Sequence, residues 1–138
     1  MEFNKDIIAL SNEETIELNI LTSNILHELG IPAHIKGYHY IRFAIILTVK
    51  QPFLIHSVTK SLYPIVAYKF DSTVSNVERA MRHAIEVAWD RGDVDVLNSF
   101  FGFTVDSKKG RPTNREFIAQ IADDIMISRY KSMKTSKS

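Results

Sequence analysis

Apolar residues recur every three or four positions along most of this chain, and glycine and proline separate the stretches in which they do. The first stretch predicts a helix from residue 12 or 13 to residue 29, which Gly30 and Pro32 then end. A second stretch predicts a helix over 35–50, although its segment AIILTV also resembles a strand. Its length and the lack of turn signals before Pro52 favour the helix.

The middle of the chain predicts two short helices and a long one. A short helix over 55–63 is expected to be broken or restarted at Pro64, because proline suits a first helical turn and not a helix interior. Another short helix covers 64–70, and residues 71–73 then supply turn and capping side chains. The long helix that follows is expected to end at Arg91, just before a glycine.

The last third of the chain predicts two more helices around a basic segment. Asp93 is expected to cap a short helix that ends at residue 101, and a polar loop follows over 102–112. Residues 113–116 fit a capping box, which predicts a final helix as far as residue 130. The chain is thus expected to consist of a flexible lead-in (1–12), one all-α domain of about six helices (13–130) and a frayed tail (131–138).

The segment 64–92 has the order of a helix-turn-helix: a short helix, a three-residue turn and a longer helix. Successive residues of a helix point about 100° apart. Apolar residues of the long helix then gather on one side, which should be buried: Val74, Val77, Ala80, Met81, Ala84, Ile85, Val87 and Ala88. Polar residues gather on the other side: Ser75, Asn76, Glu78, Arg79, Arg82, His83 and Glu86.

This polar side has the chemistry to recognise DNA in the major groove. Arg79 and Arg82 can each donate to the two acceptors of guanine, Glu78 can accept from cytosine, and Asn76 can pair with adenine. Hydroxyls and cations around the turn and the basic loop are candidate phosphate contacts: Ser72, Thr73, Ser75, Lys60, Lys69, Lys108, Lys109 and Arg111. Two alternatives stay open. Many solvated helix faces look like this, and Glu78 could instead close a capping box with Ser75.

Four segments resemble a known family: HELGIPAHIKGYHYIR (27–42), VTKSLYP (58–64), VERAMRHAIEVAWDRGDVDVLNSFFGFTV (77–105) and KGRPTNREFIAQIAD (109–123). They resemble the C-terminal effector domain of stage zero sporulation protein A, a sporulation response regulator, over roughly residues 13–127. The resemblance implies a helical bundle that binds a short DNA box as tandem copies, regulates transcription and contacts RNA polymerase sigma factors.

The resemblance also implies roles for particular residues. It implies base contacts by Glu78, Arg79, Arg82 and His83, and phosphate contacts by the basic loop at Lys108 and Lys109. Asn76 stands where the family is expected to have arginine, and one bidentate base contact contributes about 1–3 kcal/mol of discrimination. A variant DNA site is therefore expected. The 138 residues leave no room for the family's receiver domain, so a stand-alone relative or an excised fragment is expected. A second hypothesis is an interaction protein that binds sigma factor or antagonises the full-length regulator.

Charge and composition agree with a DNA-binding protein and count against other classes. Residues 1–30 hold six Asp and Glu against one Lys, a net −5, whereas the rest holds 16 Lys and Arg against 10 Asp and Glu, a net +6. The chain has no cysteine, no bilayer-length apolar run and no signal-peptide pattern, which predicts a cytoplasmic protein away from membranes. It also lacks nucleophile-elbow, phosphate-loop and metal-ligand motifs, so neither an enzyme nor a metal or cofactor is expected.

Overall fold

The structure, a computed structural model, describes residues 12–102 and 110–136, and all regular elements in these ranges are helical. They are α2 (Asn12–Glu28), α3 (Lys36–Lys50), the 3-10 helix η1 (Pro52–His56), the π-helical turn η2 (Val58–Leu62), α4 (Tyr63–Lys69), α5 (Val74–Arg91), α6 (Val94–Phe101) and α7 (Asn114–Ser136). The predicted all-α fold of about six helices is confirmed. The lead-in falls outside the described residues, except that Asn12 already begins α2.

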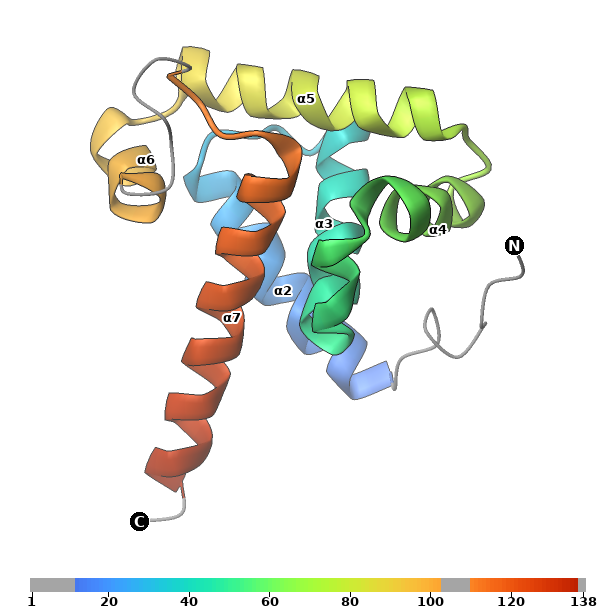
Figure 1. Cartoon of the computed structure of the whole chain (residues 1–138). Helices are drawn as coiled ribbons and strands as arrows, with labels where there is room; N and C mark the ends of the chain where they lie inside the picture. Colours follow the sequence, from blue (N-terminus) through green and yellow to red (C-terminus); the bar gives the residue numbers. More distant parts are fainter. Residues whose placement is uncertain (1–11, 103–109, 137–138) are drawn as a thin grey trace.

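Helix α3 lies at the centre of the domain and contacts α2, α5 and α7. Its predicted apolar face is buried, and so are Ala44, Ile46 and Leu47, which lie around the rest of its circumference. This all-round burial explains why its sequence resembled a strand, because a helix in the middle of a bundle is apolar on every side. Figure 1 shows α5 lying across one end of the bundle and α7 extending away from it.

The beginning of α3 packs directly against the backbone of α5. A Cβ atom at Gly37 would lie 2.1 Å from the carbonyl oxygen of Ala80 and 2.8 Å from the Cβ of Ala84. Only glycine leaves room for this approach, since contacts below about 3 Å cannot be relieved by a fixed backbone. Gly37 therefore sets how closely α5 can lie on α3.

The predicted single helix over 55–63 is wrong, because η1 ends at His56 and the chain leaves the helical conformation at Ser57 before η2 begins. The predicted restart at Pro64 is confirmed, and η2 leads into α4 without a gap. The amides of Leu62 and Tyr63 donate to carbonyls five residues back, on Ser57 and Val58, which makes a π turn. Pro64 then lies in the first turn of α4, where its missing N–H group is not needed. The wider π turn accommodates the proline within a continuous helical segment.

Helix α7 extends to Ser136, so its predicted end at residue 130 is wrong. Residues 131–135 are exposed, and their polar composition suggested a frayed tail. They nevertheless include Lys131, Met133 and Lys134, which have good helix propensity, and no glycine or proline interrupts them. The basic residues near the C-terminus also complement the helix dipole. No helix among the described residues is long and apolar enough to cross a bilayer.

Candidate nucleic-acid interface

Helices α4 and α5 and the turn between them form the predicted helix-turn-helix. Asp71 adopts a left-handed conformation in the turn, with φ at 50°. The side chain of Thr73 accepts a hydrogen bond of 3.1 Å from the amide of Asn76 and so caps the N-terminus of α5. The alternative capping box of Ser75 with Glu78 is wrong, because Thr73 is the cap and the Glu78 carboxylate pairs with Arg82. The hydroxyl of Thr73, a predicted phosphate contact, therefore already has a partner as an acceptor.

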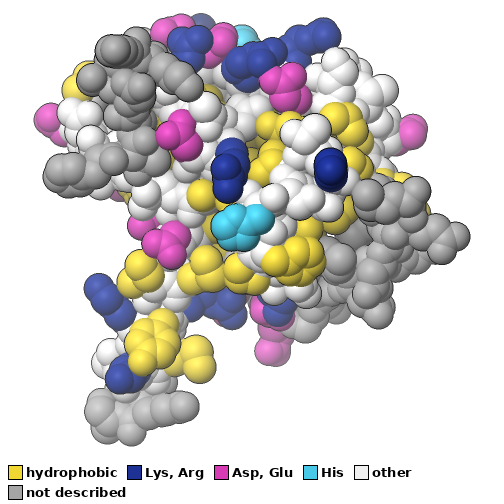
Figure 2. Space-filling view, in the orientation of Figure 1, with side chains coloured by type: hydrophobic (Ala, Val, Ile, Leu, Met, Phe, Trp, Pro, Cys, Tyr) yellow, Lys and Arg dark blue, Asp and Glu magenta, His cyan; other side chains and the backbone are white. Residues whose placement is uncertain are grey.

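The two sides of α5 separate largely as predicted. The buried residues are Val77, Met81, Ala84, Ile85 and Ala88, while Val74 is exposed and Ala80 and Val87 are half-buried. The polar side reaches solvent: Ser75, Asn76, Arg79, Arg82 and His83 are exposed, and Glu78 and Glu86 are half-buried. Figure 2 shows Lys and Arg along the upper edge of the molecule, over α5, with acidic side chains between them.

On one flank of the polar side, α5 and the start of α3 enclose a shallow hollow. Lys36, the first residue of α3, lines it together with Ser72, Asn76, Arg79 and His83. The cap position of α3 is Ile35, whose side chain makes no cap hydrogen bond, and the first turn holds no acidic residue. Within the described residues, the Arg79 guanidinium has no ion pair. This flank is therefore positively charged and accessible.

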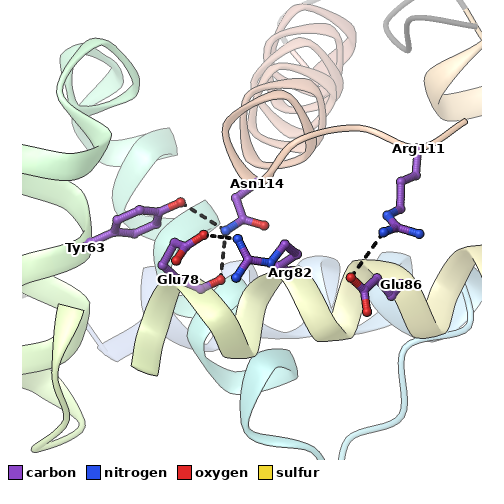
Figure 3. Close-up of polar contacts among 6 residues, drawn as sticks. All are labelled: Tyr63, Glu78, Arg82, Glu86, Arg111 and Asn114. Carbon is purple, nitrogen blue, oxygen red and sulfur yellow. Dashed lines mark hydrogen bonds and ion pairs between the residues drawn. The ribbon is translucent and has the colours of Figure 1, made fainter. Parts of the chain in front are cut away.

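On the other flank, α5 faces the segment that leads into α7, as Figure 3 shows. Glu78 and Arg82, one turn apart, form an ion pair, and Arg111 lies 3.2 Å from the Glu86 carboxylate. The Nδ2 atom of buried Asn114 donates to the hydroxyl of Tyr63 and to the main-chain carbonyl of Glu78, each at 3.0 Å. Two predicted DNA contacts, Arg82 and Arg111, thus have carboxylate partners on the same helix.

These ion pairs leave the two arginines usable for DNA. The Arg82 side chain is 53% exposed and its Glu78 partner is 38% exposed. Ion pairs at such exposure contribute about 0–1 kcal/mol, because water screens them and both side chains lose freedom. A phosphate or a guanine edge can therefore replace either carboxylate at small cost, and the planar guanidinium keeps further donors in the paired state.

Tyr63, the first residue of α4, is buried against Asn114 and stays neutral at physiological pH. Burial raises the pKa of the Tyr63 phenol above its ordinary value of 10.0. The hydrogen bond from Asn114 opposes this rise, the Glu78 carboxylate adds to it and Arg82 again opposes it. Because its hydroxyl accepts the Asn114 bond, Tyr63 connects the start of α4 to the start of α7.

The remaining predicted phosphate contacts fall in different places. Ser72 is half-buried and lines the hollow beside Lys36, whereas Ser75 is exposed at the start of α5. Lys60 is exposed on η2, and the Lys69 ammonium lies 5.8 Å from the ring of Phe43. Lys108 and Lys109 are outside the described residues.

Sequence analysis missed two residues of this interface, Lys36 and Asn114. Lys36 comes from a helix 43 residues before Arg79, and Asn114 is 36 residues after Glu78. No local pattern pointed to either, because only the packing of α3 and α7 against α5 brings them close to the polar side of α5. The residues of the basic flank and of the Asn114 contact therefore come from three separate parts of the chain.

An all-helical fold with an exposed, capped and polar second helix defines this chain as a helix-turn-helix domain. The family model described as Sporulation initiation factor Spo0A C terminal matches residues 22–125, from the middle of α2 into α7. The chain belongs to this family, whose domain is a DNA-binding effector domain of a transcriptional regulator. The family resemblance found in the sequence is confirmed.

Proposed function

We propose that this protein is a sequence-specific transcriptional regulator of the cytoplasm, whose helix α5 enters the major groove of a short DNA site. The observation that supports this most directly is the polar side of α5. Its exposed Asn76, Arg79, Arg82 and His83 lie opposite a buried apolar side, and the first three belong to the N-terminal half of the helix. The N-terminal half of the second helix is the part that contacts bases in helix-turn-helix proteins.

In this proposal the bases are contacted by α5 and the phosphates by its surroundings. Arg79 and Arg82 donate to guanine, Glu78 accepts from cytosine, and Asn76 and His83 contact the neighbouring base edges. Lys36 and Ser72 contact one phosphate strand from the basic flank, where they lie beside Arg79. On the other flank Arg111 contacts the second strand after leaving Glu86, together with the lysines of the basic loop.

Selection of bound sites from a random duplex library tests this function. We expect a short consensus box that contains guanine, with a preference opposite Asn76 for adenine. Titrations of the selected box and of single-base variants should then show that Arg79→Ala loses about 1–3 kcal/mol of discrimination at one position.

The matched control for this titration is Arg91→Ala, an exposed arginine in the last turn of the same helix. It lies 12 residues beyond Arg79, or roughly 18 Å along the axis, and should leave the base preference unchanged. The proposal fails if the wild-type protein binds every duplex equally over a range of salt concentrations. Binding of that kind would reflect only charge.

Two further partners, a sigma factor of RNA polymerase and a second copy on tandem boxes, are predictions from the family resemblance. A duplex with two adjacent boxes should bind two molecules more tightly than two separated boxes do. A pull-down with purified sigma factor tests the other partner. Capture of sigma factor by a protein that binds no duplex would favour the alternative hypothesis of an interaction protein.

A further inference from the structure

We propose that Asn114 is a positioning residue for DNA recognition, which holds the two helices of the helix-turn-helix in register so that Glu78 and Arg82 face the groove correctly. This inference rests on the proposed function. It concerns a residue that would not touch DNA itself, since Asn114 is 9% exposed and lies between the start of α7 and α5, beside Glu78 and Arg82.

The side-chain amide of Asn114 donates both of its hydrogens to the two helices of the helix-turn-helix. One is donated to the hydroxyl of Tyr63, the first residue of α4, and the other to the main-chain carbonyl of Glu78 in α5, each at 3.0 Å. Figure 3 shows the amide between these two helices, reaching from the start of α7. One buried side chain from a third helix therefore contacts both helices of the motif at once.

The backbone that presents Asn114 is itself held firmly. Thr113 and Glu116 form the predicted capping box, with the Thr113 amide 2.9 Å from the Glu116 carboxylate and the Glu116 amide 3.2 Å from the Thr113 hydroxyl. The next residue, Arg115, donates from Nε to the carbonyl of Ile55 at 2.9 Å. The amide of Asn114 thus approaches α4 and α5 from a backbone that is fixed on both sides, as a supporting residue of a binding site requires.

The bond to Glu78 is placed where it affects recognition most. It contacts the main chain of α5 at the residue whose carboxylate pairs with Arg82, so both side chains project from a turn whose distance from α7 this bond restrains. Glu78, Arg82 and Tyr63 line the same hollow as Asn114. A bidentate contact to a base tolerates little displacement, so a shift of this turn should weaken base contacts before phosphate contacts.

A role in stability alone makes a different prediction. If Asn114 only stabilised the fold, its loss would lower the fraction of folded protein and weaken binding to all duplexes by the same factor. Positioning predicts instead that the ratio between affinities for the selected box and for an unrelated duplex falls. The ratio is independent of the folded fraction and therefore separates the two roles.

The experiment compares Asn114→Leu, which keeps the branched shape and the neutral charge but removes both donors, with Tyr63→Phe, which removes one hydrogen-bond partner. We expect the affinity ratio to fall about tenfold for Asn114→Leu and about threefold for Tyr63→Phe. Asn24→Leu, the same change at an exposed position of α2, is the control and should keep the wild-type ratio.

Each outcome of this experiment has a definite meaning. If Asn114→Leu does not fold, as judged by circular dichroism, the ratio of Tyr63→Phe decides alone. A wild-type ratio in every folded variant overturns the positioning role and leaves the proposed function intact. A wild-type protein without preference for any duplex overturns the proposed function, and the role of Asn114 in recognition with it.

Discussion

The close contact between α3 and α5 leads to a prediction that contradicts simple helix propensity. Alanine favours a helix over glycine by about 1 kcal/mol, so Gly37→Ala should stabilise α3 if the helix were unobstructed. The added Cβ, however, would lie 2.1 Å from the carbonyl oxygen of Ala80 and 2.8 Å from the Cβ of Ala84. Because the nearer atom is backbone, α5 as a whole must retreat by about 1.3 Å to restore an ordinary contact of 3.4 Å.

The cost of this retreat follows from the packing of α5. Met81, Ala84 and Ala88 are fully buried, and moving their helix loosens their contacts with the core. Overpacking of this kind costs about 1–3 kcal/mol, and a backbone clash belongs at the upper end. After subtraction of the helix-propensity gain, we expect Gly37→Ala to destabilise the protein by about 2 kcal/mol, which lowers Tm by roughly 6–10 °C in a domain of this size.

Urea unfolding measured by helical circular dichroism and by the fluorescence of Trp89, the sole tryptophan, checks this value. The control is Lys36→Ala, one residue earlier on the same helix but exposed, which should change stability by less than about 0.5 kcal/mol. If Gly37→Ala leaves the midpoint unchanged or raises it, α3 and α5 do not approach as closely as described, and Gly37 does not set the distance between them.

Three further predictions concern Lys36 beside α5, Tyr63 at the start of α4, and the ion pairs of Glu14 with α3 and α7. Lys36→Ala should weaken binding to specific and unrelated duplexes by similar factors. It should also reduce the slope of log K against log salt concentration by about 1, and an unchanged slope would show that Lys36 contacts no phosphate. The raised pKa of Tyr63 means that the unfolded chain releases this proton first, so wild-type stability should be insensitive to this group below pH 10 and decline above it. Tyr63→Phe should show a smaller decline in urea titrations between pH 9 and 11, and equal slopes would contradict the assigned burial. Glu14 accepts from Lys50 and lies 3.8 Å from Arg129, so Glu14→Gln should cost about 1 kcal/mol at low salt and much less in 1 M salt, whereas a salt-independent loss would point to packing.

Local signals in the sequence predicted most of the helices, because the spacing of apolar residues marks each helix and capping residues, glycine or proline mark its ends. The turn before α5 and the glycine after it placed that helix from Val74 to Arg91. The errors arose where two local signals competed. Both Thr73 and Ser75 can cap a helix, and the backbone conformation of Thr73, with φ −114° and ψ 156°, decides between them.

The candidate site could be predicted only as far as it lies on one helix. The periodicity of α5 separated its polar from its apolar residues, which identified Asn76, Arg79, Arg82 and His83 as exposed. Lys36 and Asn114 could not be found in the same way. Whether they reach α5 depends on how helices far apart in sequence pack, and hydrophobic periodicity says which face is buried but not against which partner.

The two contacts that place α5 share a property with consequences for recognition. Gly37 packs against the carbonyl of Ala80, and Asn114 donates to the carbonyl of Glu78, so both act on the main chain of one helical turn. Neither contact depends on the exposed side chains of α5. A substitution on the polar side should therefore be able to change the base that is recognised without changing how the helix is held. The helix should thus tolerate Asn76→Arg with unchanged stability and a changed base preference, whereas any side chain at Gly37 should impair both.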